Sequence, residues 1–288
     1  MLTLSSHSLE KAIALLGDLT QASLDLSESI LSSLYTNLTH CVWPVNFTLP
    51  LSSSTPQFAA LQNLLFLSLQ TPTPAPLIFC SSAGTGTASP HGPVPEAPIS
   101  SFAHASPTGY TRVKLVCERI IETAVASSKA NATILRISQI TPSMTVGTRL
   151  WNPVEATPLM IRAGAIISSL PLGPPDMQSR TWIPLDVLAA AVCSIAGLAG
   201  TGKERATDGH AGPANAQTNG TTNGTTNGMT NSDLASYSKT PASPQLTYNL
   251  VHPRPFPWSA LLPLLRTADL SFNIIPWSQW LQGLENGP

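Results

Sequence analysis

Long and short apolar segments alternate along the first half of the chain. The segments at 58–70 and 110–126 have helical spacing, whereas those at 75–86 and 132–140 are predicted as buried strands. The first of these strands runs into a loop of small residues. Strands that alternate with helices of this length are typical of a parallel sheet whose strands are joined by crossover helices. The sequence therefore predicts an α/β fold.

Further elements are predicted on both sides of this core. A helix is expected at 28–35, and an apolar run, THCVWPVNF, follows it. In the second half the sequence predicts a loop at 151–165, a strand at 181–186 and a buried helix at 187–199. The end of the chain is predicted to contain a strand, a helix that starts near Trp258, a short strand and a final Trp-rich helix.

One segment has a different composition from the rest. Between 200 and 244 Gly, Thr, Asn and Ser dominate, and TNGTTNGTTNG repeats every four residues. Such a tract buries too little apolar surface to offset its ordering entropy, so we predict a disordered insertion at 200–244. We expect residues 1–150 to form the core domain, and 151–199 together with 245–288 to form a smaller C-terminal region.

The charge balance restricts the partners of the chain. Its 288 residues include 15 acidic and 14 basic side chains, which argues against a nucleic-acid partner. The charged fraction of 10% is low and predicts a large covered surface. Without a secretory signal or a membrane-spanning apolar stretch, we expect a cytoplasmic protein with no membrane partner. The four cysteines form no C-x-x-C pair, which predicts reduced core thiols and no zinc site.

The stretch TGYTRVKLVCERI places Tyr110 four residues before Lys114 on a predicted helix. Residues four apart share one helix face, so the phenol and the ammonium can point into one cleft. A nearby cation lowers the pKa of a phenol, which favours proton transfer near neutral pH. Ser82, after the strand LIFC, is placed to orient a substrate carbonyl. The alternative is that Tyr110 is a packing residue and Lys114 a solvated charge on the helix.

Several stretches together resemble one known family. They include GDLTQASLDLSESILSSLY, FCSSAGT, GYTRVKLVCERIIETA, LRISQITPSMTVGTRLWNPVEATPLMIRA, WIPLD and WSALLPLLRTADLSF, in this order. The chain resembles the thioester reductase domains of the extended short-chain dehydrogenase/reductase superfamily. These domains are found at the ends of fungal polyketide synthases, peptide synthetases and adenylate-forming reductases.

The resemblance implies a reaction and roles for individual residues. Ser82 would polarise a thioester carbonyl, Tyr110 would donate a proton, and Lys114 would lower the tyrosine pKa and hold the nicotinamide ribose. A hydride from NADPH would then release an aldehyde, or an alcohol after a second turnover. The acyl group would arrive on the phosphopantetheine arm of an acyl or peptidyl carrier protein, with a synthase as a further partner. The region after Trp151 would form the substrate side.

The resemblance also implies a cofactor site at the ends of the strands. Besides Tyr110 and Lys114, the residues expected to contact NADP are Asp18, Asn46, Ser138 and Gln139.

Two departures from the family pattern affect this cofactor site. The glycine-rich turn that would hold the cofactor pyrophosphate is not found before Gly17, the first glycine of the chain. We therefore expect an incomplete, N-terminally truncated Rossmann-like parallel sheet. In addition, Cys41 and Val42 stand where the family usually has Asn and Ala.

Three hypotheses stay open from the sequence. The chain is an NADPH-dependent reductase of carrier-bound thioesters in fungal secondary metabolism, or an inactive remnant that acts as a binding or accessory protein of a synthase. The third hypothesis is that the sequence lacks the part that encodes the glycine-rich turn.

Overall fold

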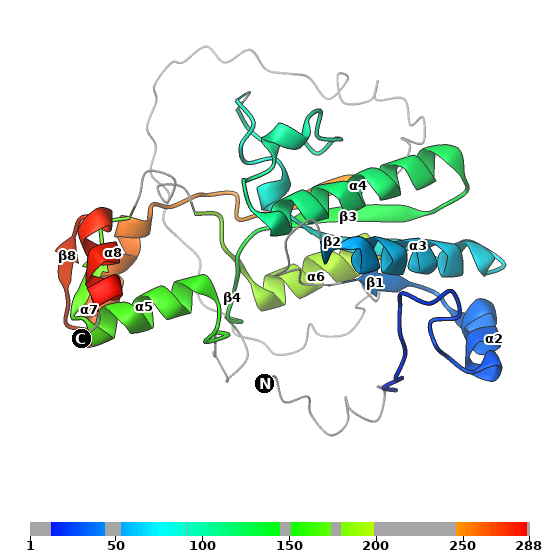
Figure 1. Cartoon of the computed structure of the whole chain (residues 1–288), viewed down its shortest axis with the longest axis horizontal. Coiled ribbons are helices and arrows are strands. Elements are labelled where there is room, and N and C mark those ends of the chain that lie inside the picture. Colours follow the sequence, from blue (N-terminus) through cyan, green and yellow to red (C-terminus); the bar gives the residue numbers. More distant parts are fainter. Residues whose placement is uncertain are drawn as a thin grey trace, which may run out of the picture.

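The computed structural model describes residues 13–43, 53–90, 92–144, 151–173, 180–198 and 246–286. Helices and strands alternate through these residues, and Figure 1 shows their arrangement. In chain order the elements are α2 (Glu28–Asn37), β1 (Cys41–Trp43), α3 (Thr55–Gln70), β2 (Leu77–Ser82), η2 (Ala83–Thr85), η3 (Phe102–His104), α4 (Gly109–Ser127), β3 (Ala132–Ile137), β4 (Ile140–Thr141), α5 (Ala156–Ile166), β5 (Ser169–Pro171), β6 (Ile183–Pro184), α6 (Leu185–Ile195), β7 (Thr247–Leu250), η5 (Trp258–Ala260), α7 (Leu261–Thr267), β8 (Asn273–Ile275) and α8 (Trp277–Asn286).

A four-stranded parallel sheet organises the larger part of the structure. Its strand order is β1-β2-β3-β7, and every neighbouring pair is parallel. The helices α3 and α4 are the crossover connections from β1 to β2 and from β2 to β3. The α/β fold predicted from the alternating segments is therefore confirmed. Because the strands are parallel, the carboxyl ends of β2 and β3 lie at the same edge of the sheet.

Apolar side chains of α3 and α4 pack on one face of this sheet. Leu61 of α3 and Val113 and Ile121 of α4 are buried in the same cluster as Phe79 of β2 and Ile134 of β3. The helix α4 runs along one side of the sheet, and α6 lies on the other side in Figure 1. Since apolar burial is the main favourable term in folding, this cluster is the principal source of stability for the sheet.

A second apolar cluster lies apart from the sheet, where α5, α7, α8 and β8 gather in Figure 1. It includes Trp258 and Trp280, whose indole N–H groups donate to backbone carbonyls of β5, at Pro171 (2.9 Å) and Ser169 (3.0 Å). Gly164 of α5 allows close packing on β5, because a Cβ there would lie 2.2 Å from the Leu170 side chain.

Two predictions about individual elements are wrong. The predicted loop at 151–165 contains the helix α5, because Pro158 falls in the first turn, where its missing N–H has no helical partner to lose. The predicted burial of the helix at 187–199 is also wrong. Of the residues of α6, which are all described, Leu188 is the only buried one, and Cys193 is exposed instead of being a core thiol.

Other predicted elements are confirmed with small changes. The strand predicted at 132–140 ends at Ile137, and Ile140 instead begins β4, which pairs with β6 in a separate two-stranded sheet. The predicted strand, helix, strand and Trp-rich helix of the chain end are present as β7, α7, β8 and α8. The segment 200–244 lies outside the described residues.

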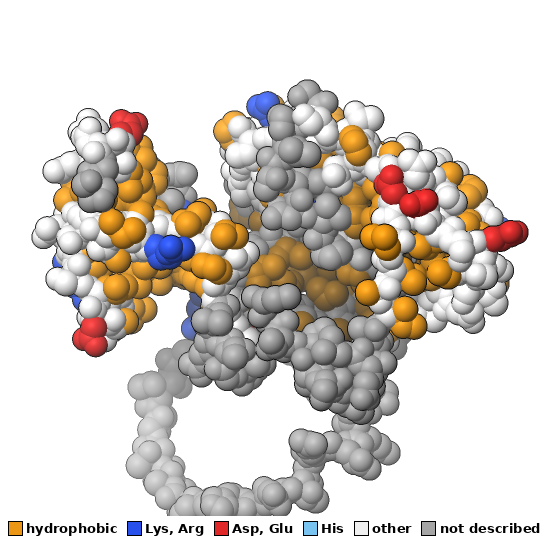
Figure 2. Space-filling model, turned by 60° about the horizontal axis from the view of Figure 1, so that its bottom comes forward, with side chains coloured by type: hydrophobic (Ala, Val, Ile, Leu, Met, Phe, Trp, Pro, Cys, Tyr) orange, Lys and Arg blue, Asp and Glu red, His pale blue; other side chains and the backbone are white. Residues whose placement is uncertain are grey.

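The surface has few charges among many apolar groups. Figure 2 shows hydrophobic side chains over both parts of the structure, with only isolated Lys, Arg, Asp and Glu side chains between them. Exposed apolar residues include Val42 of β1, Val187 of α6 and Leu159 of α5. None of the helices in the described part of the chain is long and apolar enough to cross a bilayer.

The core assignment can be tested with two substitutions in α3. Leu61 is 0% exposed, so Leu61→Ala should lower the free energy of unfolding by about 3 kcal/mol through lost burial and a residual cavity. Phe66, which is 57% exposed on the same helix, is the matched control, and Phe66→Ala should change it by less than about 0.5 kcal/mol. Urea unfolding followed by circular dichroism measures both. Equal losses for the two variants would contradict this core.

Candidate active site at the end of β2

The site begins where helix α4 starts. Thr108 caps the helix, since its hydroxyl accepts a hydrogen bond from the Thr111 N–H at 3.2 Å. Tyr110 therefore lies in the first helical turn and Lys114 in the next, on the side of the helix that faces β2. The local sequence thus fixes both side chains on a regular element and not on a loop.

The end of β2 supplies the second part of the site. Ser82 is the last residue of β2, and its hydroxyl accepts a hydrogen bond from the Gly84 N–H at 3.2 Å as the chain turns into η2. Gly84 permits this turn to approach α4, because a Cβ there would lie 2.6 Å from the Thr111 side chain. The Ser82 hydroxyl lies near enough to the Tyr110 hydroxyl to lower its pKa. The structure therefore brings these two predicted site residues close together.

Lys114 lies beneath the site and is only 1% exposed. Its Nζ donates to the Cys80 carbonyl of β2 at 2.6 Å and lies 4.9 Å from the centre of the Phe79 ring. Burial lowers the pKa of Lys114 to about 8, although the negative charge of Glu118 opposes that shift. The ammonium can therefore lose its proton near neutral pH.

The pKa of Tyr110 moves in the opposite direction to the one predicted from its spacing to Lys114. Burial raises the pKa of the Tyr110 hydroxyl, and the hydrogen bond with Ser82 partly offsets that rise. The Lys114 ammonium lies 5.8 Å from the centre of the tyrosine ring and donates to the Cys80 carbonyl. Burial of the phenol therefore decides the direction of the shift.

Two predicted residues lie at the end of the neighbouring strand. Ser138 follows β3 directly, and the last residue of β3 pairs with Ser82 of β2, so the two serines lie at the same edge of the sheet. The Ser138 hydroxyl is within 2.9 Å of the Thr181 hydroxyl, and the Gln139 amide donates to the Glu155 carboxylate. Both side chains are thus held by the segments that follow β3.

Of the remaining two predicted residues, Asp18 lies in a separate turn before α2. Asp18 accepts hydrogen bonds from the backbone N–H and the hydroxyl of Thr20, at 2.9 and 2.7 Å, which lower the pKa of its carboxyl group. The turn that contains Asp18 is tied to α3, because the Asn63 amide donates to the Leu19 carbonyl at 2.8 Å. Asn46 lies outside the described residues.

The sequence analysis missed a buried polar group next to the site. Glu118 and Arg136 form an ion pair at 2.7 Å with both side chains 0% exposed, and Ser81 donates to Glu118 at 2.5 Å. Two signals were available in the sequence. Glu118 stands four residues after Lys114, on the apolar side of the predicted helix, and Arg136 interrupts an otherwise apolar strand.

The donor set of this site suits a nicotinamide cofactor and a carbonyl. A phenol and an ammonium on successive helical turns can bind ribose hydroxyls, and a serine hydroxyl beside the phenol can bind a carbonyl oxygen. No cluster of His, Cys, Asp or Glu that could hold a metal ion is found within the described ranges.

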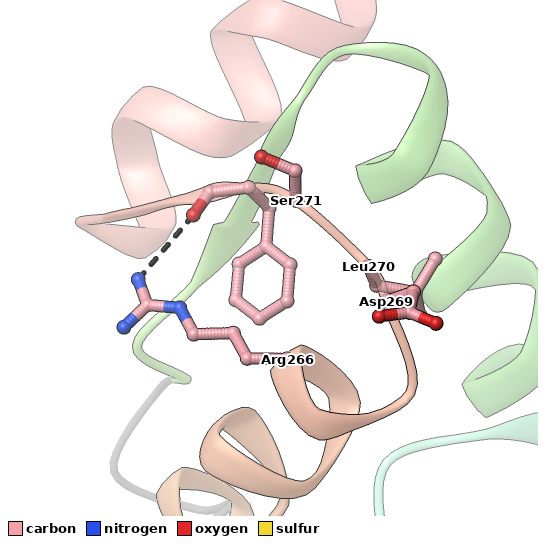
Figure 3. Close-up of a pocket in the computed structure, with 5 residues that line it drawn as sticks. Arg266, Asp269, Leu270 and Ser271 are labelled. Atoms are coloured by element: carbon pink, nitrogen blue, oxygen red, sulfur yellow. Dashed lines mark hydrogen bonds between the residues drawn. The ribbon is translucent and has the colours of Figure 1, made fainter.

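A shallow pocket in the second cluster offers less chemistry. It is lined by residues between Arg266 and Phe272, and Figure 3 shows the Arg266 guanidinium donating to the Phe272 carbonyl, at 3.3 Å. The same guanidinium lies 5.2 Å from the centre of the Phe272 ring. Its main polar group is thus already engaged with the protein, so the site at β2 and α4 is the stronger candidate.

Comparison with known proteins points to one family. Residues 2–192 match a family of NAD-binding domains described as male sterility protein. An adenylate-forming reductase from Heterobasidion annosum is 27% identical over 278 residues, which cover 94% of this chain and 21% of that protein. A non-canonical non-ribosomal peptide synthetase from Acremonium egyptiacum is 33% identical over 181 residues, which cover 60% of this chain and 16% of that protein. The chain thus spans about a fifth of the length of these relatives.

A solved structure has the same fold. The terminal R domain of the myxalamid PKS-NRPS biosynthetic pathway superposes with a TM-score of 0.69 at 18% sequence identity. The match covers 98% of this chain and 61% of that domain. The parallel sheet and its crossover helices therefore have the Rossmann-like fold of that domain.

The burial of Lys114 predicts a pH-dependent stability difference. Its folded pKa of about 8 lies below the ordinary value of 10.5, so the unfolded chain binds more protons between these values. The penalty for burying the charge is therefore complete below pH 8 and disappears as the pH rises to 10.5. Lys114→Met should raise the free energy of unfolding at pH 7 by about 2 kcal/mol, and this gain should shrink through that window.

Urea unfolding of the two proteins at several pH values measures this difference. Comparison with the unsubstituted chain cancels the titration of Cys41 and Cys117, whose pKa values burial raises to about 11 and 12. A Lys114→Met chain that is less stable at pH 7, or whose gain is the same at every pH, would contradict the assignment.

Proposed function

Because the chain belongs to the thioester reductase domains of the extended short-chain dehydrogenase/reductase superfamily, we propose that it reduces carrier-bound acyl thioesters with NADPH. The observation that carries this proposal is that Ser82 at the end of β2 faces Tyr110 in the first turn of α4, with Lys114 one helical turn away and bonded to β2. The substrate is an acyl or peptidyl group on the phosphopantetheine arm of a carrier protein. The proposed setting is fungal secondary-metabolite biosynthesis.

Ser82 and Tyr110 bind the carbonyl oxygen of the thioester in this proposal. Their hydroxyl groups lie near each other, so one carbonyl oxygen can accept from both. NADPH, when bound, supplies a hydride to the carbonyl carbon. Tyr110 donates its proton to the oxygen, and the C–S bond then breaks to release an aldehyde and the carrier thiol. A second hydride transfer converts the aldehyde to an alcohol.

Lys114 has two tasks in this mechanism. It holds the ribose of the cofactor, together with Tyr110, and it stabilises the tyrosinate that forms when the phenol loses its proton. Its pKa of about 8 allows the ammonium to return a proton to Tyr110 near neutral pH. Ser138 and Gln139, at the end of β3, are the residues proposed to lie near the nicotinamide, and Asp18 and Asn46 those near the rest of the cofactor.

A second candidate function is that of an inactive binding or accessory protein of a synthase. The observation that favours this function is that the polar groups proposed to hold the cofactor are hydrogen-bonded to other groups of the protein. Lys114 is bonded to the Cys80 carbonyl, Ser138 to Thr181 and Gln139 to Glu155. A ligand must displace these internal contacts before it can use the same groups, and the exposed apolar surface suits association with another protein.

Cofactor binding separates the two candidates. Titration of the purified chain with NADPH, followed by nicotinamide fluorescence, should show saturable binding, with NADH binding more weakly. Lys114→Met should weaken that binding, because it removes the ammonium proposed to hold the ribose. Absence of saturation at millimolar NADPH would exclude the reductase and favour the accessory role.

The proton donor can be tested by removing a single oxygen atom. Tyr110→Phe should lower turnover of an acyl thioester by at least about 100-fold, because general acid catalysis commonly contributes this much, and should leave NADPH binding nearly unchanged. The matched control is Tyr35→Phe in α2, which should retain full activity. NADPH oxidation with a phosphopantetheine thioester measures both. A Tyr110→Phe chain with full turnover would refute the role of Tyr110.

A further inference from the structure

Three side chains of α4 meet three consecutive residues of β2. Tyr110, Lys114 and Glu118 are four residues apart, and they therefore lie on one side of the helix. The Lys114 ammonium donates to the Cys80 carbonyl, the Glu118 carboxylate accepts from the Ser81 hydroxyl, and the Tyr110 side chain lies near Ser82. A shift of α4 along β2 or about its own axis would alter all three contacts together.

The contact at Glu118 is held more firmly than the other two. The Arg136 guanidinium donates to the Glu118 carboxylate through Nη2 at 2.7 Å and through Nε at 3.1 and 3.2 Å. Ser81 and Arg136 are register partners in β2 and β3, so the carboxylate is bound from both strands at once. Both charged side chains are fully buried, which prevents water from replacing either partner.

The same guanidinium also holds the loop that connects β2 to α4. Arg136 donates through Nη1 to the Pro95 carbonyl at 2.8 Å and through Nη2 to the Ala97 carbonyl at 3.0 Å. Between these two residues, the Glu96 carboxylate accepts from the Asn249 backbone N–H of β7 at 2.7 Å. The loop and the helix that follows it are therefore fixed to the sheet at one point.

The apolar contacts of α4 with the sheet have no such directionality. Val113, Cys117 and Ile121 pack against Phe79 and Ile134 in the first apolar cluster. Apolar packing of this kind tolerates small slides and rotations, whereas an ion pair with several hydrogen bonds requires one geometry. Buried ionic groups are known to specify one arrangement among several that apolar packing allows.

We propose that Glu118 and Arg136 are positioning residues, whose ion pair fixes the setting of α4 on β2 that brings the Tyr110 hydroxyl to Ser82. Their relevance to catalysis rests on the proposed function, but their effect on the position of Tyr110 does not. Neither residue needs to touch substrate or cofactor for this role.

The test uses the full chain labelled with tyrosine that carries ¹³C at Cζ, the ring carbon bonded to the hydroxyl oxygen. Tyr110→Phe assigns the Tyr110 signal, and Ser82→Ala shows how far that signal moves when the Ser82 hydroxyl is lost. Replacing only one charge would leave the other unpaired in the core, so both are removed together in Glu118→Met/Arg136→Met. We expect this double variant to move the Tyr110 signal at least as far as Ser82→Ala does.

A matched control is present on the same helix. Arg119 and Glu122 form an ion pair at 2.6 Å, which is partly exposed to solvent. Arg119→Met/Glu122→Met removes two charges from α4 as well, and it should leave the Tyr110 signal in place. A folded Glu118→Met/Arg136→Met chain with an unmoved Tyr110 signal would overturn the proposal, and so would an equal movement in the control.

A milder variant decides the question if the double variant fails to fold. Ser81→Ala keeps the ion pair and removes only the hydrogen bond that links it to β2. It should move the Tyr110 signal in the same direction as Ser82→Ala and by a smaller amount, and an unmoved signal would overturn the link through Ser81.

Turnover gives an independent readout. If the chain reduces thioesters, Glu118→Met/Arg136→Met should lower kcat by at least the factor found for Ser82→Ala, with a KM for NADPH within about twofold of the unsubstituted chain. An unchanged kcat would overturn the positioning role in catalysis. If the unsubstituted chain shows no turnover, the proposed function is contradicted. The movement of the Tyr110 signal still tests the positioning role in that case.

Discussion

The buried ion pair between Glu118 and Arg136 connects more elements than any other polar interaction of the site. It joins α4, β3, β2 through Ser81, and the loop at Pro95. Taking two charges out of water costs on the order of several kcal/mol per ion, and their attraction compensates only if nearly every hydrogen-bonding group is satisfied. Here both carboxylate oxygens accept hydrogen bonds and each guanidinium nitrogen donates at least one. These hydrogen bonds, made from several elements at once, hold the two charges in a single geometry.

The ion pair helps to place the first turn of α4 at the edge of the sheet where the strands end. Parallel strands bring Ser82 and Ser138 to one edge, but the helix that carries Tyr110 reaches that edge only after a long connection from β2. A connection of this length does not by itself determine where the helix begins. Gly84 allows the connection to start close against α4, and Arg136 holds its middle to the sheet. The first turn of α4 then meets the end of β2 reproducibly.

The sequence predicted the large elements because their apolar spacing depends on local geometry alone. Helices α3 and α4 have apolar residues at helical spacing, such as Leu61 and Ile121, and β2 is a short continuous apolar run that includes Phe79. The sequence-based prediction failed for α5, because Pro158 and Gly164 resemble loop signals. Pro158 is tolerated in the first turn of the helix, and Gly164 makes room for the Leu170 side chain. The prediction also failed for the burial of α6, since composition does not reveal which neighbour covers a helix.

The candidate site was predictable in its residues and less so in its electrostatics. Spacing placed Tyr110 and Lys114 on one helix face, and the strand before them indicated Ser82. The pKa of Tyr110 depends on where the ammonium lies relative to the phenolic oxygen, and four-residue spacing does not determine this. The partnership of Glu118 with Arg136 was missed because the two residues belong to different elements, and one sequence gives no direct signal of contacts between elements.

The choice between a working reductase and an accessory protein comes down to a competition for the Lys114 ammonium. In the structure its hydrogen bond goes to the Cys80 carbonyl, a neutral acceptor within the core. Burial weakens the hold of Lys114 on its proton, so a neutral amine is readily formed, and ribose hydroxyls can act toward it as both donors and acceptors. Glu118 and the sheet keep α4 in place while that exchange occurs. The chemistry at Tyr110 therefore requires a change of partner at Lys114 and no movement of the helix that carries both residues.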